Sequence, residues 1–305
     1  MTATPDIIEH YNNLVTKWID SKDAEKPRKA LLSFMETPEY ASIPYFQKNR
    51  RFVTSTKLKA YEKCQLFARY EYVDGIETAY DDNDAFVMGI AFDQLKTNGK
   101  EFFETVYQIL APREKRAEES TKIQLTNSMG TILTQMDVES SLHPLFPLNP
   151  KKENLIWLAY GKIPCKAEID CTERRDGTKI IGDFKTTRNI ATFEAMGYSL
   201  QMGMYFGAYL ETRMEKREAD LFVVDKHDWA RSHVWTLTIP TLEAEQGRVN
   251  NLISAWAESE ETGIFEPPRL VNADGSPNME GLKQLWESKY YSVCPYARTA
   301  PATRI

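Results

Sequence analysis

The sequence lacks the features that mark membrane, secreted and repeat proteins. Its 305 residues contain no apolar run near the roughly 20 residues that span a bilayer. The segment MTATPDIIEHYNN has neither the basic part nor the apolar part of a secretory signal, so we expect a cytoplasmic protein. No internal repeat and no low-complexity tract is visible. What remains is the composition of an ordinary globular chain.

Cysteine and histidine, the usual ligands of structural zinc, are scarce. The four cysteines are Cys64, Cys165, Cys171 and Cys294, and no two of them form a C-x-x-C pair, which argues against a zinc ribbon. We expect buried free thiols. The four histidines are scattered and flank no acidic cluster, so the sequence assigns them no role.

The chain also lacks the basic excess of a protein that holds nucleic acid by overall charge, because its formal net charge is −6. A local basic groove is still compatible with this balance. Carboxylates gathered around metal ions would account for part of the negative charge, because bound cations offset it.

The first half of the chain is predicted to be helical. Apolar residues recur at helical spacing, which gives helices over residues 4–20, 26–37, 54–72, 84–98, 101–110 and 126–136, and a solvated charged segment over 113–122. Three prolines within residues 142–150 predict an extended connector.

The second half is predicted to be mixed. Strands are expected over residues 155–160, 221–224 and 234–239, with helices over 191–214, 242–258 and 279–290. The fold class is therefore α/β, with one mixed central sheet flanked by helices.

The most informative stretch is residues 167–187, AEIDCTERRDGTKIIGDFKTT. The Asp176-Gly177 pair predicts a two-residue hairpin turn between two strands. Counting back from that turn places Asp170 opposite Asp183 and Glu168 opposite Lys185. Two carboxylates then meet across the ladder at roughly 5 Å between Cβ atoms, which is destabilising unless a cation lies between them.

This arrangement predicts a metal site beside an ammonium group. Asp170 and Asp183 supply hard oxygen ligands for Mg²⁺, and the backbone carbonyl of Phe184 can supply a third. Lys185 lies on the same strand face as Asp183, where it can orient water and offset developing negative charge. Glu168 either pairs with Lys185, which we favour, or binds a second metal. The chemistry suits phosphodiester hydrolysis.

These residues resemble the PD-(D/E)XK nuclease superfamily, with Asp170 as the first acid and Asp183-Phe184-Lys185 as the D-x-K. The segment YSLQMGMYFGAY is similar to the Q-x-x-x-Y motif of the RecB-like and RecE-like branches, and FVMGIAFDQL is similar to their G-x-A-x-H helix. Further similar segments extend the resemblance over roughly residues 52–270.

The resemblance implies a restriction-endonuclease-like core with a helical N-terminal elaboration. Residues 1–50 would form a helical extension and residues 51–305 the nuclease domain. Within that domain, residues 51–150 would be helical, 151–240 would hold the catalytic sheet, and 241–305 would form C-terminal helices.

The resemblance also implies site residues. Asp93 stands where the family usually has a metal-binding histidine, so the implied metal ligands are Asp93, Asp170, Asp183 and the carbonyl of Phe184. Gln201 and Tyr205 would support the site or contact DNA. The implied cofactor is Mg²⁺, with Mn²⁺ as a substitute.

The implied activity is that of a RecE-like (exonuclease VIII) enzyme, which resects linear duplex DNA from the 5′ end in phage or prophage recombination. Such an enzyme works beside a single-strand annealing protein and forms homo-oligomers. Two alternatives stay open: a RecB-like nuclease for single-stranded or flap DNA, and a DNA-binding subunit with a weakened metal site. An iron–sulfur cluster is not expected, because Cys165 and Cys171 lie roughly 20 Å apart along one predicted strand.

Overall fold

The computed structural model describes residues 4–21, 24–43, 45–75, 89, 91–93, 95–96, 133–148, 150–187, 189–225, 231–266 and 278. The chain forms two compact units, each described by itself below. The helical unit comprises residues 1–80, 156–166 and 247–305, and the sheet unit comprises residues 81–155 and 167–246. The predicted boundary at residue 50 stays a prediction.

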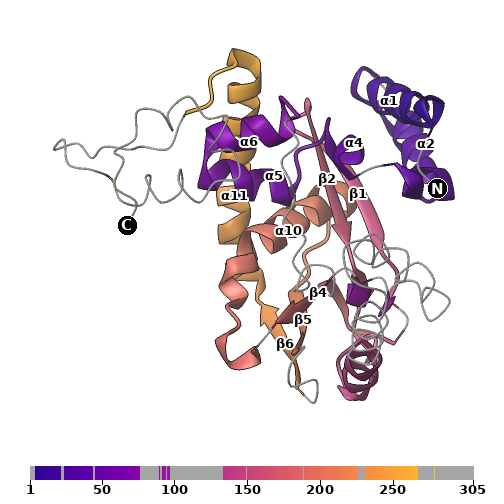
Figure 1. Ribbon diagram of the computed structural model, residues 1–305, viewed down its shortest axis with the longest axis vertical. Helices are drawn as coiled ribbons and strands as arrows, with labels where there is room; N and C mark the ends of the chain where they lie inside the picture. Colours follow the sequence, from indigo (N-terminus) through magenta and orange to yellow (C-terminus); the bar gives the residue numbers. More distant parts are fainter. Residues whose placement is uncertain are drawn as a thin grey trace, which may run out of the picture. The chain divides into compact units, whose positions relative to one another are not determined.

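The helical unit begins with α1 (Pro5–Ile19) and α2 (Glu25–Met35), which lie side by side (Figure 1). The short helices α3 (Pro38–Ser42) and α4 (Tyr45–Asn49) follow. Apolar residues of α1, α2 and α3 form one core, in which Trp18 stacks on Phe52 with ring centroids 6.0 Å apart. The first two predicted helices are thus confirmed.

The predicted helix over residues 54–72 is two helices, α5 (Ser55–Lys63) and α6 (Gln65–Tyr72). Cys64 separates them with an extended backbone, φ −164° and ψ 112°. The backbone N–H of Leu66, at the start of α6, is satisfied by the carbonyl of Glu266 at 3.1 Å. A contact so distant in sequence leaves no trace in the local periodicity, which runs through the break.

Helix α11 (Ile239–Thr262) confirms the predicted helix over 242–258 and extends it. Its second half packs on α5 in the helical unit (Figure 1). The Tyr61 hydroxyl donates to the carbonyl of Ala255 at 3.0 Å and lies 2.8 Å from the Ser259 hydroxyl. The ring of Tyr61 also meets the edge of Trp256.

The sheet unit contains four strands in the order β3 (Cys171–Glu173), β4 (Lys179–Thr187), β5 (Ala219–Asp225) and β6 (Ser232–Leu237). The outer pairs are antiparallel, whereas β4 and β5 are parallel. Parallel neighbours need a crossover, and α10 (Ser199–Arg213) supplies it, preceded by the 3₁₀ turns η2 (Ile190–Thr192) and η3 (Ala195–Tyr198). The predicted α/β class with a mixed sheet is confirmed.

A separate two-stranded ladder joins β1 (Glu153–Ala159) and β2 (Ile163–Ile169). The chain therefore changes sheets at Asp170, because β2 pairs with β1 and only β3 pairs with β4. The backbone register Cys171↔Gly182 agrees with the predicted placement of Asp170 opposite Asp183. The predicted continuation that puts Glu168 opposite Lys185 is wrong, because Glu168 belongs to the other ladder.

The two faces of β4 have different surroundings. Ile180 and Phe184 face an apolar core that also contains Cys171 and Phe222. Gly182 lies on this face, and a Cβ there would approach Cys171 Sγ to 2.1 Å, so only glycine fits. The opposite face carries Asp183 and Lys185.

Several predicted elements lie outside the described residues: the helices over 101–110 and 279–290, the charged segment over 113–122, and parts of the helices over 84–98 and 126–136. Residues 133–142 are helical. No helix of the described part of the chain has the length and apolarity that crossing a membrane requires.

The buried Lys57 of α5 generates a prediction about pH. Its side chain is 1% exposed, with Nζ 2.8 Å from the carbonyl of Arg50 and over the rings of Tyr72 and Trp256. Burial lowers its pKa from 10.5 to about 8. The unfolded chain thus keeps this proton to higher pH than the folded chain, so this site's contribution to stability rises between about pH 8 and 10.5.

In Lys57→Met this increment is absent. The free energy of unfolding of the wild type should therefore gain up to about 3 kcal/mol relative to Lys57→Met between about pH 7 and pH 10.5. Urea unfolding of both proteins across this range measures the difference. Parallel pH profiles would contradict the prediction.

Candidate functional site

The three residues selected by the hairpin pattern come together. Asp183 and Lys185 leave the same face of β4, and Lys185 Nζ is in ionic contact with Asp183 Oδ2. Asp170 Oδ2 accepts a hydrogen bond of 2.9 Å from the backbone N–H of Phe184. Asp170 and Asp183 are only 9% and 2% exposed, so both carboxylates are largely removed from water.

Helix α10 supplies Gln201 and Tyr205, which lie one turn apart. Gln201 Nε2 donates to Asp183 Oδ1 at 2.9 Å and to the Tyr205 hydroxyl at 2.7 Å. Tyr205 is buried, and its pKa is raised well above 10 by burial and then by the nearby Asp183. Gln201 thus fixes the Asp183 carboxylate, and Tyr205 fixes Gln201 from beneath the site.

Asp93 reaches the same cluster through Lys152, which lies just before β1. Lys152 Nζ is 2.7 Å from Asp93 Oδ2, 3.2 Å from Glu168 Oε1 and 3.6 Å from Asp170 Oδ1. Three acids from three parts of the sequence therefore share one ammonium group. Glu168, for which we favoured Lys185 as partner, is bound to Lys152.

The approach of the Asp93 segment to the sheet depends on a glycine. A Cβ on Gly89, one turn before Asp93, would lie 3.3 Å from the Thr186 hydroxyl on β4. That contact is tighter than ordinary packing, so a larger side chain would push this helical segment away from the strand. The small residue of the G-x-A-x-H-like segment therefore serves close packing.

Burial and mutual repulsion raise the pKa values of Asp170 and Asp93 in this cluster. Burial raises the pKa of Asp170 well above its ordinary 3.8, and the charges of Asp183 and Asp93 raise it further. Burial also raises the pKa of Asp93, which Lys152 opposes. Burial lowers the pKa of Lys152 and Lys185, but the carboxylates outweigh it, so both pKa values are raised. Both lysines thus stay protonated and offset the carboxylate charge.

Lys152 is the site residue that sequence reasoning missed. It stands in the run Lys151-Lys152-Glu153, which is typical of a solvated segment, and it matches no family motif. Only its position between Asp93 and Asp170 gives it a role. No local pattern could have found it.

The carboxylate oxygens of this cluster are suitable ligands for a hard cation, but their arrangement is not that of a formed metal site. Asp183 Oδ2 is buried, and the partner that it meets is the ammonium of Lys185. Buried carboxylate oxygens of this kind are favourable ligands for Mg²⁺ or Mn²⁺. However, no group of three His, Cys, Asp or Glu side chains in the described residues is placed to hold a metal ion as it stands. The ammonium of Lys152 lies between Asp93 and Asp170, so the predicted ligands share a cluster without reaching ligand geometry.

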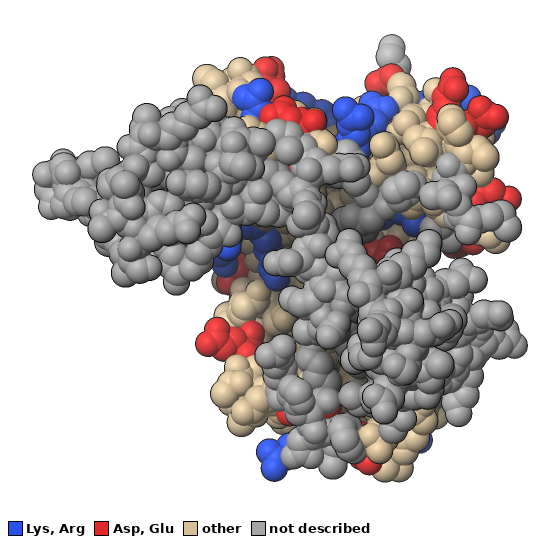
Figure 2. Space-filling model, in the orientation of Figure 1, with Lys and Arg blue, Asp and Glu red and all other residues tan. Residues whose placement is uncertain are grey.

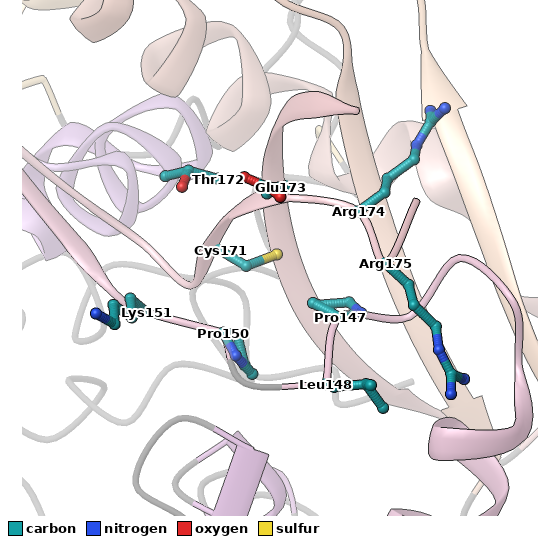
Figure 3. A pocket seen from close by; sticks show the side chains of 9 residues that line it. All are labelled: Pro147, Leu148, Pro150, Lys151, Cys171, Thr172, Glu173, Arg174 and Arg175. Atoms are coloured by element: carbon teal, nitrogen blue, oxygen red, sulfur yellow. The ribbon is translucent and has the colours of Figure 1, made fainter. Parts of the chain in front are cut away.

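The tip of the β3–β4 hairpin borders a cavity of about 320 Å³. Figure 3 shows that the side chains of Arg174 and Arg175 leave this segment in opposite directions. Arg174 Nη2 lies 2.8 Å from Oδ1 of the fully buried Asp220, and Arg175 Nη1 donates to the carbonyl of Ser141 at 2.6 Å. Arg174 therefore forms a structural ion pair with Asp220.

A second cavity, of about 360 Å³, adjoins the acid cluster because Lys152 lines it. Its basic lining residues outnumber the acidic ones, Glu153 and Glu215. They are Lys151, Lys152, Lys179, Arg213 and Arg217. We name it the basic cavity. On the face of the molecule shown in Figure 2, by contrast, basic and acidic side chains of the described residues are interspersed.

The mixed sheet, the paired buried acids and the adjacent lysine define an α/β fold of the nuclease type. Residues 54–267 match the family described as "PDDEXK-like domain of unknown function (DUF3799)", and the chain belongs to this family. The resemblance to the PD-(D/E)XK superfamily is thereby confirmed. No curated protein matches the chain.

A solved structure agrees with this fold. A protein of Eubacterium rectale, named as a candidate exonuclease, aligns with a TM-score of 0.53 at 11% identity, over 86% of this chain and 92% of that one. The structure named SSO0001 aligns with a TM-score of only 0.30 at 15% identity, over 67% of this chain and 84% of that one, and supports no conclusion.

The position of Lys152 generates a prediction about cation binding. In Lys152→Met the acid cluster loses the ammonium that Asp93, Glu168 and Asp170 share. The cation-free variant should therefore be less stable than the wild type, by roughly 2 kcal/mol. Mg²⁺ or Mn²⁺ should raise its unfolding temperature more than that of the wild type, because a divalent cation then meets no competing ammonium.

Differential scanning fluorimetry with and without the cation measures both effects. Lys151→Met is the matched control, because Lys151 is the exposed neighbour of Lys152. The prediction is wrong if Mg²⁺ raises the unfolding temperature of Lys152→Met no more than that of the wild type.

Proposed function

We propose that this protein is a Mg²⁺-dependent DNA exonuclease that hydrolyses phosphodiester bonds at the ends of linear DNA. The observation that supports this proposal most strongly is that Asp170, Asp183 and Lys185 share one largely buried site in a PDDEXK-like chain. The fold likeness to a protein named as a candidate exonuclease supports the same reaction class.

The roles of the side chains follow from their contacts. A divalent cation held by the carboxylates would neutralise phosphate charge and make water a stronger nucleophile. Gln201 holds the Asp183 carboxylate in one orientation. Lys185 orients the attacking water and offsets the charge that develops on the phosphate oxygens. Asp93 and the Phe184 carbonyl stay predicted cation ligands.

The basic cavity supports a polyanionic substrate. The formal charge of the whole chain is −6, yet the lining of this cavity carries five basic residues against two acidic ones. Four of these basic side chains form ion pairs with carboxylates, so phosphate groups of a DNA strand would compete for them and would meet Lys151 most directly. Lys152 belongs both to this lining and to the acid cluster, so a bound strand would pass close to the site.

The resemblance to RecE-like enzymes suggests the substrate end and the biological role. The enzyme would resect duplex DNA from the 5′ end, leave a 3′ overhang and work beside a single-strand annealing protein in phage-type recombination. It would act as a homo-oligomer in the bacterial cytoplasm.

The alanine substitution of Lys185 tests the reaction. Purified protein with Mg²⁺ should release nucleotides from linear duplex DNA, and Lys185→Ala should lower that rate by at least about 100-fold, because the developing negative charge loses its nearest ammonium. Circular dichroism checks that the variant is folded. The exposed Lys29→Ala on α2 is the control and should keep full activity.

End-labelled substrates test polarity. Early release of a 5′ label from linear duplex supports resection from the 5′ end, whereas early release of a 3′ label refutes it. A preference for single strands or flaps would instead indicate the RecB-like alternative. Equal release by wild type and Lys185→Ala removes Lys185 from the mechanism.

A second candidate function is that of a DNA-binding subunit with a weakened metal site. Two observations favour it. Asp93 stands where the RecB-like and RecE-like nucleases usually have a metal-binding histidine, and the ammonium of Lys152 lies between Asp93 and Asp170. Duplex binding without any Mg²⁺- or Mn²⁺-dependent hydrolysis would support this function over the first.

The basic cavity generates a salt-dependence prediction. Lys151 is exposed and lines both cavities described above. Lys151→Glu should weaken duplex binding by roughly 10-fold at low salt and lower the salt slope of the affinity by about one or more, because a phosphate contact is lost.

Fluorescence anisotropy over a range of NaCl concentrations measures the slope. Lys29→Glu applies the same charge change on α2 and should leave the slope nearly unchanged. An equal loss of affinity in both variants would mean that overall charge, not the cavity, attracts the DNA.

A further inference from the structure

A row of aromatic side chains begins directly at Lys185. The ammonium of Lys185 lies 5.1 Å from the centre of the Tyr198 ring, at the end of η3. Tyr198 stacks on Phe193 with ring centroids 5.4 Å apart and planes 11° apart. Phe193 in turn lies 4.9 Å from the ring of Trp235 on β6, and Trp235 lies 4.1 Å from His233. We call these four residues the aromatic row.

The aromatic row is not part of the apolar core. Tyr198, Phe193 and Trp235 are half-buried, and His233 is exposed. The nearby Met196 is 60% exposed. The core on the opposite face of the sheet is closed by Phe184, Phe222 and Phe146, which belong to a different cluster. Packing alone therefore does not account for four rings at the surface.

The position of the row favours one kind of ligand. Trp235 and His233 lie two residues apart on β6, which is the edge strand of the sheet among the described residues, so a chain can approach them from outside. From that edge the row leads through Phe193 and Tyr198 to Lys185. Half-exposed rings offer stacking faces to nucleobases, which present a π-face whatever their sequence.

We propose that the aromatic row is a stacking platform for unpaired bases of the DNA strand that enters or leaves the acid cluster. Basic side chains near the cluster attract the phosphates, and the row binds the bases. The platform recognises a single-stranded end without sequence preference. This inference rests on the proposed function for the identity of the strand, but it is tested by binding alone.

The test compares two oligonucleotides of equal length and charge, an oligothymidine and its abasic analogue, in buffer without divalent cations. Trp235→Ala should weaken oligothymidine binding by roughly 5- to 100-fold, the range expected for the loss of one stacked base. It should leave binding of the abasic analogue unchanged. Trp235→Phe, which keeps a ring, should restore most of the affinity. Fluorescence anisotropy gives the dissociation constants.

Two further variants serve as a second test of stacking and as a control. Phe193→Leu preserves apolar volume but removes a stacking face, and it should also weaken binding of oligothymidine but not of the abasic analogue. It takes the place of Trp235→Ala if Trp235→Ala folds poorly. Tyr160→Asn removes an exposed ring at the β1–β2 turn, where φ is 52° and asparagine is tolerated, and it should change neither affinity. Unfolding temperatures show whether each variant is native.

The results separate this inference from the proposed function. Equal losses for both oligonucleotides, or no loss, would overturn the stacking platform even if the protein digests DNA. Base-dependent loss in a protein that hydrolyses no DNA would support the platform and refute the exonuclease.

Discussion

Asp170 and Asp183 lie close together and largely out of water, and this arrangement sets the demands on the surrounding structure. Burial and the neighbouring charge of Asp183 raise the pKa of Asp170 well above its ordinary value. Two ammonium groups offset these effects from two sides: Lys185 contacts Asp183, and Lys152 contacts Asp170. A charged group removed from water needs such partners to persist in a folded protein.

The fold supplies these partners from separate elements. Strand β4 carries Asp183 and Lys185 on one face, and the crossover helix α10 adds Gln201, which orients Asp183. The change of sheets at Asp170 lets that residue leave the β1–β2 ladder and accept the N–H of Phe184. Glu168 stays in the β1–β2 ladder, and Lys152, just before β1, contacts both Glu168 and Asp170.

In this cluster the ammonium of Lys152 occupies a position that a divalent cation would compete for. Carboxylates that repel one another attract whatever positive charge can reach them, whether a divalent ion or a tethered ammonium. Lys152 meets Asp93, Glu168 and Asp170 within 3.6 Å. A metal ion at this site would have to displace Lys152, so its affinity would depend on that ammonium as well as on the carboxylates. The carboxylate of Asp93 strengthens the hold on Lys152, because Lys152 Nζ lies 2.7 Å from Asp93 Oδ2.

Local pattern was sufficient for the parts of the structure whose causes are local. The alternation around Asp176-Gly177 placed Asp170 opposite Asp183 and put Lys185 beside Asp183, because side chains alternate along a strand. Helical periodicity located α1, α2 and α11. It failed at Cys64, where an extended residue separates two helices and the N–H of Leu66 bonds to the distant Glu266. It also misplaced Glu168, because nothing in that segment shows that β2 pairs with β1.

The sequence by itself thus determined the family, the mixed α/β class and the acid–lysine core of the site, since spacing along one hairpin fixes all three side chains. Only the tertiary structure decided which cations meet those acids and which rings flank them. Lys152, Tyr198 and Trp235 come from distant segments, and their positions depend on sheet order and helix packing. Such contacts are set by the balance of the whole fold, so no short pattern encodes them.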